Sequence, residues 1–298
     1  MEISTSLSYF INRSDRDAFP EGTFIRILRM AHEAGFRTVD APLCHEYEEF
    51  ITSKDNWEYV IRELKEEADR LGMKFNQSHL PYYQFLNVSP SKFQFHEENV
   101  RRGIIASGIL GVRWAVIHPC GTIGGNDRAD KKMILEKNIE YFKPKLELAA
   151  RNNTGIALEN MGRQYYYDEN ALIELISGLN GSFSAGTAGA AGSAGICWDF
   201  GHANIAKLDQ KKSLGNAGGF LKALHVDDNN GWYDNHFFPF QGSVPWVQLM
   251  KVLKETGYKG DMTLEVNPPY NCNDDFIMTM GRHSYRTAEY LVKCYNEA

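Results

Sequence analysis

The feature that most constrains this chain is a regular alternation of short β-rich runs with longer amphipathic stretches, repeated about eight times without a break. Strand-like runs are predicted at 2–8, 38–42, 75–81, 112–119, 155–161, 195–203, 221–228 and 262–268. Helices are predicted at 23–34, 57–72, 91–110, 130–152, 168–178, 244–257 and 276–296. Alternating βα units favour a parallel sheet covered by helices.

Eight such units in 298 residues favour a closed barrel over an open doubly wound sheet. We therefore expect an α/β fold in which residues 1–298 form a single (β/α)8 TIM-barrel domain. The first strand is not followed by GxGxxG, which weakens the dinucleotide-binding alternative. The sixth unit is the weakest, because 203–220 shows only a short helical pattern. The Gly-rich segment 177–195 is expected to be a flexible loop at the N-terminal face, away from any chemistry.

Composition limits the classes of function. The chain is 43% hydrophobic and 23% charged, as globular proteins are, and its net charge of −6 lacks the basic character of nucleic-acid-binding proteins. Five cysteines form no CxxC pair, which favours a reduced, intracellular protein. We see neither a signal peptide nor an apolar run long enough to span a bilayer. We therefore predict a cytoplasmic protein without nucleic-acid or membrane partners, for which a homo-oligomer is possible.

Ionisable side chains stand at the C-terminal ends of several predicted strands. They are His79, His118, Glu159, Asp199, His202, His225, Asp227 and Glu265. In a barrel those ends meet at one face, where active sites lie. Any one of these residues alone is more often a hydrogen-bonded structural residue. Together, however, converging carboxylates and imidazoles are costly to bury without a cation. Imidazole with carboxylate suits Mn, Co, Zn, Fe or Ni, and carboxylate alone suits Mg, so the pattern predicts a bound divalent metal.

A second pair of candidate residues follows His225 in a loop rich in Asn, Gly and Pro. Asp234 and His236 stand two residues apart, and in an extended segment this spacing turns both side chains to one side. The plainer alternative is a surface loop with a buried histidine. Asp234 and His236 are therefore candidate site residues only in combination with the strand-end residues.

The complete ordered set resembles the xylose isomerase-like barrel superfamily over essentially the whole chain. That superfamily contains sugar isomerases and epimerases, inosose dehydratases and DNA-repair enzymes of the endonuclease IV type. In the epimerase branch, the resemblance implies a metal held by Glu159, Asp199, His225 and Glu265, with His202 contacting substrate. In the endonuclease branch three zinc ions use a larger set, and all nine of its positions are matched here. The resemblance to that branch therefore implies possible additional metal ligands, namely His79, His118, His202, Asp234 and His236. The ligand inventory alone therefore does not separate the branches.

The loops around the predicted site favour a sugar over DNA. A DNA enzyme needs phosphate contacts from Lys and Arg, whereas these loops supply only Arg128 and Arg163. Aromatic residues such as Tyr82 and Trp232 would instead form apolar walls for sugar rings. Further substrate contacts are predicted from four histidines, His79, His118, His202 and His236. Aromatic rings also stack on unstacked bases, so charge is the deciding feature.

We therefore predict a divalent-metal-dependent isomerase or epimerase acting on a sugar, sugar phosphate or polyol, with Mn, Co, Mg or Zn. A metal on the carbonyl and hydroxyl oxygens would stabilise an enediolate. By resemblance, Glu159 and Glu265 are the acid/base pair. The alternatives are an inosose dehydratase-like lyase and an endonuclease IV-like phosphodiesterase. A sugar-binding barrel without catalysis is the least favoured, because binding alone does not require paired glutamates on a metal.

Overall fold

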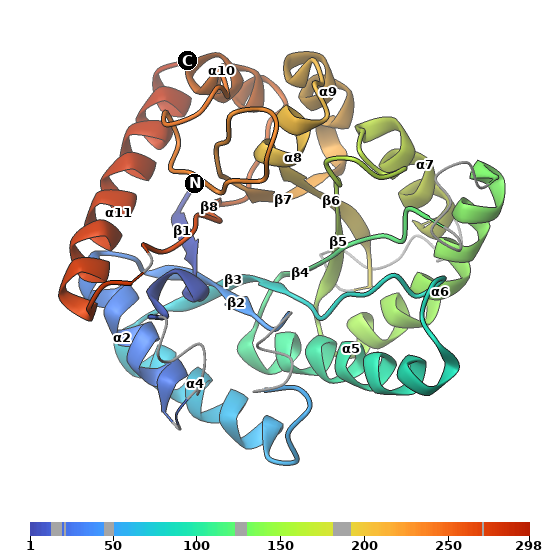
Figure 1. Cartoon of the computed structure of the whole chain (residues 1–298), viewed down its shortest axis with the longest axis horizontal. Coiled ribbons are helices and arrows are strands. Elements are labelled where there is room, and N and C mark those ends of the chain that lie inside the picture. Colours follow the sequence, from blue (N-terminus) through green and yellow to red (C-terminus); the bar gives the residue numbers. More distant parts are fainter. Residues whose placement is uncertain (13–19, 21, 45–50, 123–129, 181–191, 270) are drawn as a thin grey trace.

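The eight predicted strands form one parallel sheet wrapped into a barrel, with helices around it (Figure 1). The computed structural model describes residues 1–12, 20, 22–44, 51–122, 130–180, 192–269 and 271–298. The strands are β1 (Ile3–Ser6), β2 (Thr38–Pro42), β3 (Lys74–His79), β4 (Trp114–Ile117), β5 (Gly155–Glu159), β6 (Ala194–Asp199), β7 (Leu221–His225) and β8 (Met262–Leu264). Each strand pairs with its neighbour in the chain, and β1 also pairs with β8.

The barrel closes just beyond the last residue of β7. Val226 forms a parallel bridge with Leu264, in which its N–H donates to the Thr263 carbonyl at 2.9 Å. The carbonyl of Val226 then accepts from the Glu265 N–H at 3.1 Å. These contacts join the two ends of the sheet, so the TIM-barrel prediction is confirmed.

Helices alternate with the strands as the sequence predicts, within a few residues at each end. The principal ones are α2 (Thr23–Ala34), α4 (Trp57–Leu71), α5 (Pro90–Leu110), α6 (Lys131–Arg151), α7 (Glu169–Asn180), α9 (Gln210–Ala217), α10 (Trp246–Glu255) and α11 (Asp274–Glu297). The helix α4 illustrates why these segments are helical. Trp57, Ile61 and Leu64 form its buried stripe, and Gly72 ends the helix with a φ of 66°.

The structure corrects the predicted ends of several strands. The predicted strand 195–203 stops at Asp199, and a short helix α8 (Phe200–Ile205) begins there, so His202 is a helical residue and not a strand-end residue. The first strand likewise gives way to a 3-10 helix, η1 (Leu7–Phe10). In the sixth unit, the weak helical pattern corresponds to two short helices, α8 and α9. Most of the Gly-rich segment 177–195 lies outside the described residues.

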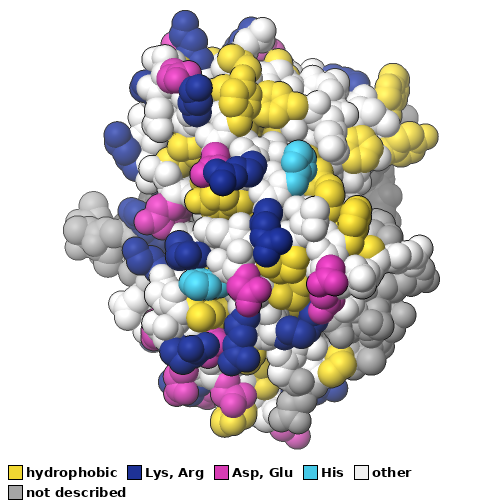
Figure 2. Space-filling model, turned by 90° about the vertical axis from the view of Figure 1, so that its left-hand side faces the viewer, with side chains coloured by type: hydrophobic (Ala, Val, Ile, Leu, Met, Phe, Trp, Pro, Cys, Tyr) yellow, Lys and Arg dark blue, Asp and Glu magenta, His cyan; other side chains and the backbone are white. Residues whose placement is uncertain are grey.

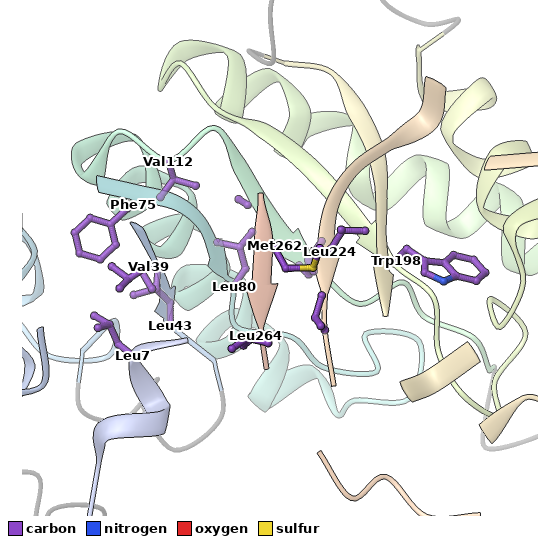
Figure 3. Packing of buried hydrophobic residues seen from close by; sticks show 14 of the residues in the cluster. Leu7, Val39, Leu43, Phe75, Leu80, Val112, Trp198, Leu224, Met262 and Leu264 are labelled. Atoms are coloured by element: carbon purple, nitrogen blue, oxygen red, sulfur yellow. The ribbon is translucent and has the colours of Figure 1, made fainter. Parts of the chain in front are cut away.

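Two apolar clusters stabilise the barrel. The larger lies between the sheet and the helices, and Figure 3 shows part of it, with Val39, Leu224 and Met262 contributed by three different strands. The smaller lies inside the barrel and consists of Trp114, Val116, Ala157, Cys197 and Ala223. Filling both sides of the strands with apolar side chains leaves polar residues at the strand ends as candidates for chemistry.

The outer surface mixes both signs of charge. On the face drawn in Figure 2, Lys and Arg side chains are interspersed with Asp and Glu. Some of these charges pair within one helix, as Arg62 does with Glu58 on α4. None of the helices in the described part of the chain has the length and apolar character needed to cross a membrane.

Candidate functional site

Side chains from six consecutive strand ends converge at the C-terminal face of the barrel. The largest group comprises Glu159, Asp199, His225 and Glu265, whose ligand atoms all lie within 4.8 Å of one another. A second group joins His79 and His118 to Glu159, and a third joins Asp227, Asp234 and His236. The structure thus brings together all the residues predicted from the strand ends and from the loop after His225.

The two carboxylate oxygens of Asp199 differ in their contacts. Asp199 is the N-cap of α8, where Oδ1 accepts the backbone N–H of His202 at 2.5 Å. Its Oδ2 is buried and has no hydrogen-bond partner among the residues that the structure describes. The three-residue spacing of Asp199 and His202 therefore follows from helix capping, in which an aspartate binds the N–H three positions later. The cap fixes the carboxylate and leaves Oδ2 available as a ligand.

Two neighbours of Asp199 hold this turn in place. The Asn160 side chain accepts the Asp199 N–H at 2.7 Å and donates to the Asp199 carbonyl at 3.0 Å, which joins the ends of β5 and β6. Gly201 allows Asp227 to approach the turn, since a Cβ at position 201 would lie 2.2 Å from Asp227 Oδ2. The backbone N–H of Gly201 donates to Asp227 Oδ1 at 3.2 Å. A glycine is therefore required at this position of the DFGH sequence.

Three histidines share one orientation. In His79, His202 and His236, Nδ1 lies against a backbone carbonyl, that of Leu80 (3.2 Å), Asn160 (2.9 Å) and Glu265 (2.8 Å), respectively. Because a carbonyl oxygen only accepts, Nδ1 carries a hydrogen in each ring, and Nε2 is the nitrogen that would bind a metal after losing any proton it carries. Each Nε2 lies near a carboxylate, within 3.3–3.4 Å of Glu159 or Asp234. Anchoring one ring nitrogen on a carbonyl is the usual support of metal-ligating histidines.

His225 and Glu159 lie at the centre of the site. His225 Nδ1 is 3.0 Å from Glu265 Oε2 and 3.2 Å from Glu159 Oε1, yet within the described part of the chain it forms no directed hydrogen bond. Glu159 Oε2, which is also without one, lies 3.1 Å from His118 Nε2. Ligands about 2.1 Å from a tetrahedrally coordinated ion stand roughly 3.4 Å apart. These buried, unpartnered atoms at that separation fit a divalent cation between them.

Burial and mutual proximity perturb the acidity of these groups. Burial opposes the charge on Glu159, but the imidazoles of His225 and His118 hold its pKa well below the usual value. Burial also disfavours the imidazolium of His225, yet the nearby Cys197 and the carboxylates raise its pKa well above the usual value. Burial raises the pKa of Asp199 to about 7 and lowers that of His118 to about 4. Without a metal, protons on the imidazoles thus supply the positive charge that the carboxylates require.

The two predicted aromatic contacts differ in position. The ring of Tyr82 packs on His118, with centroids 3.7 Å apart, and therefore borders the cluster. Trp232 is 65% exposed, and its ring lies under the Lys207 ammonium at 4.7 Å. The Trp232 carbonyl accepts a hydrogen bond from Arg163 at 2.6 Å. Trp232 thus lies on the outer surface of the loop, against two cations instead of the metal-binding side chains.

Two acidic residues of the site were not assigned a function from the sequence. Asp40, in the middle of β2, is buried, and its Oδ1 has no hydrogen-bond partner in the described ranges of the chain. Asp227 is fully buried and belongs to the third candidate ligand group. The detectable signal was a charged residue within an otherwise apolar strand in TVDAP, and a second acid two residues after His225.

A comparison with family models identifies this architecture. Residues 28–279 match the model of the xylose isomerase-like TIM barrel. The chain belongs to that family. Among curated proteins, this barrel is 28% identical over 137 residues to the uncharacterized protein MJ1311 of Methanocaldococcus jannaschii, covering 44% of this chain and 43% of that protein. It is 36% identical over 50 residues to fructoselysine 3-epimerase of Escherichia coli O157:H7, covering 17% and 18%. The matches thus span less than half the length of these curated relatives.

Solved structures show the same fold over the whole chain. An L-ribulose 3-epimerase superimposes with a TM-score of 0.75 at 14% identity, covering 99% of this chain and 96% of that one. A D-tagatose 3-epimerase-like protein gives 0.73 at 20% identity, covering 100% and 99%. The IOLI protein, solved with a bound zinc atom, gives 0.71 at 16% identity, covering 100% and 99%. At these identities the likeness establishes the fold of this xylose isomerase-like barrel.

The perturbed acidities predict a strong pH dependence of metal binding. The pKa of His225 is raised well above its usual value and that of Asp199 to about 7, so protons compete with a metal for both groups as the pH falls through and below neutrality. A metal must displace these protons, so its apparent affinity should fall as the pH falls, by about tenfold per pH unit for each proton displaced. Chelator-competition titrations on both sides of neutrality measure this slope. An affinity that does not change with pH would contradict the ligand assignment.

Proposed function

We propose that this protein is a divalent-metal-dependent sugar epimerase or isomerase. The observation that carries the proposal is the group Glu159, Asp199, His225 and Glu265, held within 4.8 Å at the open end of the barrel. The fold neighbours include an L-ribulose 3-epimerase, and a curated relative with a partial match is a fructoselysine 3-epimerase. The zinc atom of the IOLI structure supports the metal dependence. Mn, Co, Mg and Zn are the candidate ions.

The chemistry of the proposed reaction is proton transfer beside a carbonyl group. A divalent ion held by these residues would supply Lewis-acid polarisation of the carbonyl group, which would favour an enediolate form of the substrate. Glu159 and Glu265 stand at the ends of β5 and β8 and approach His225 from two directions, at 3.2 and 3.0 Å. With substrate between them, one carboxylate removes the proton and the other returns it.

The surrounding side chains would bind and orient the sugar. His79, His202 and His236, whose Nε2 atoms face Glu159 or Asp234, would contact the hydroxyl groups that do not bind the metal. Tyr82 offers an apolar face beside His118. The cations Arg163, in the segment after β5, and Lys207, in the turn after α8, both contact Trp232 and would accommodate a negatively charged substituent. The pocket therefore suits a small polyhydroxylated carbonyl compound.

The proposal is tested by metal analysis together with a substrate panel of ketoses, their phosphates and inososes. We expect stoichiometric divalent metal and conversion of at least one ketose to an epimer or aldose. Dehydration of an inosose without any epimerisation would favour the lyase alternative. If the metal-loaded protein binds sugars but converts none of them, the proposed catalytic function is wrong and the protein is a sugar-binding barrel.

A DNA-directed phosphodiesterase is the second candidate, because the structure brings together all nine residues that match the endonuclease branch. We predict no salt-sensitive binding to abasic duplex DNA tighter than about 10⁻⁶ M at physiological salt, the tight end of non-specific binding. The physical reasons are the net charge of −6 and the few basic residues in the loops after the strands. Incision of an abasic oligonucleotide at enzyme-like rates, abolished by Glu265→Gln, would replace the sugar proposal with the repair function.

A further inference from the structure

A second cavity lies at the opposite end of the barrel from the metal-binding side chains. Its volume is about 390 Å³, within the range of small-ligand sites. It is lined by the first residues of β4 and β7, by part of β3, and by the loop 256–261 that leads into β8. This places it at the N-terminal face. None of the residues assigned to the proposed sugar site lines it.

The cavity is basic although the chain as a whole is acidic. Arg113, Lys222 and Lys259 line it, and none of the three forms an ion pair with a carboxylate within the described residues. Asp261 is the one acid among the lining residues, and its Oδ1 already accepts the Glu2 N–H at 3.2 Å. Burial and the guanidinium of Arg113 lower the pKa of Lys222, which shows that two like charges are held close together. An anion bound between the two cations would offset their mutual repulsion.

Local packing fixes the positions of the charges and of two apolar walls. The stem of Lys222 crosses Gly195, where a Cβ would lie 2.1 Å from Lys222 Cγ. Its ammonium donates to the Gly219 carbonyl at 2.6 Å. Trp114 and Tyr258 are 7% and 5% exposed and form walls of the cavity. The site thus has a preorganised cationic part and an aromatic part.

We propose that this cavity binds a small phosphorylated metabolite, with its phosphate between Arg113 and Lys222 and its carbon skeleton against Trp114 and Tyr258. The guanidinium fork matches two phosphate oxygens, and the ammonium of Lys222 contributes a further donor. The volume exceeds what a bare phosphate needs, so the remaining space beside the aromatic rings favours an organic phosphate.

Calorimetric titration of the metal-loaded full chain tests the proposal, with glycerol 3-phosphate, inorganic phosphate and glycerol as probes. Glycerol 3-phosphate has no carbonyl group, so it is not a substrate of the proposed reaction. We expect one molecule to bind per chain, more tightly than inorganic phosphate, while glycerol does not bind. Arg113→Gln should weaken binding by at least about tenfold, because it removes charged hydrogen bonds. Arg113→Lys should retain part of the affinity.

Two control variants locate the site. Arg282→Gln changes an exposed arginine on α11 and should leave binding unchanged. Asp199→Asn removes a proposed metal ligand, and phosphate binding should survive it. The proposal is overturned if neither phosphate binds, or if inorganic phosphate binds as tightly as glycerol 3-phosphate. It is also overturned if binding is lost in Asp199→Asn and kept in Arg113→Gln, because the anion then binds at the metal centre. Lys222→Gln repeats the test should Arg113→Gln fail to fold.

Discussion

The single variants Glu159→Gln and Glu265→Gln should each reduce turnover by about 10²–10⁴-fold, the usual contribution of a positioned acid or base. Glutamine keeps the shape of the side chain and one coordinating oxygen, so part of the metal should remain bound. What it lacks is a basic oxygen. The measurement is kcat together with incorporation of deuterium from heavy water at the carbon beside the carbonyl, which wild type should perform and each variant should not.

A matched control separates proton transfer from the loss of a buried charge. Glu169 is also a buried glutamate, 4% exposed, but it accepts hydrogen bonds from Asn170 and Asn216, away from the cluster. Glu169→Gln should therefore keep full turnover. If Glu159→Gln retains its metal and still exchanges the substrate proton at the wild-type rate, Glu159 is only a ligand, and His202 and His236 become the next candidates for the base.

The isotope experiment also distinguishes two kinds of mechanism. Epimerisation with solvent deuterium in the product supports proton transfer by the glutamates. Product that forms without solvent exchange indicates a hydride shift or a proton transfer shielded from water, and the enediolate assignment then loses its main support. The buried position of Glu159, 1% exposed, makes a shielded transfer more plausible for this residue than for Glu265, whose side chain is 25% exposed.

The sequence predicted the architecture because the barrel is built from local patterns. Each amphipathic helix and β-rich run is visible within a short window, and parallel strands bring their C-terminal ends together whatever the details of the loops. This is why Glu159, Asp199 and His225, which lie far apart in the chain, could be assigned to one place. The convergence required only the strand count and the position of each residue at the end of its strand.

Other features depend on contacts that no local pattern contains. His202 was expected at a strand end, but the Asp199 cap starts a helix there, and both a strand and a capped turn are compatible with ICWDFGH. The Asp227 contact with Gly201 joins the segment after β7 to α8, and closure of the barrel brings Glu265 of the last unit near the buried Asp40 of β2. The basic cavity around Arg113 arises in the same way, from residues that the sequence scatters over β4, β7 and the loop before β8.

Asp199→Ala and His225→Ala should each weaken metal binding by more than about 100-fold, since even outer-shell partners of a metal typically contribute about 10–100-fold. Asp199 Oδ2 and His225 Nδ1 are buried and form no hydrogen bond within the described residues, so either substitution removes a donor atom from the four-residue ligand group. Metal content after gel filtration and chelator competition measure the effect. Wild-type metal content in both variants would show that the ion binds elsewhere, for example at the Asp227 group.

For Asp199 the result must be separated from the loss of a helix cap. Asp199→Asn keeps an oxygen for the His202 N–H, and asparagine caps helices as well as aspartate does, so α8 should persist. The amide replaces the second oxygen, however, and an NH2 group does not bind a metal ion.

Asp209→Ala gives the opposite control, because Asp209 caps α9 through the Lys212 N–H and belongs to none of the ligand groups in the described residues. We expect Asp209→Ala to lower stability by about 1 kcal/mol and to keep its metal. Asp199→Asn should keep its stability and lose its metal, and the reverse pattern would assign Asp199 to the architecture of the turn instead of to the metal.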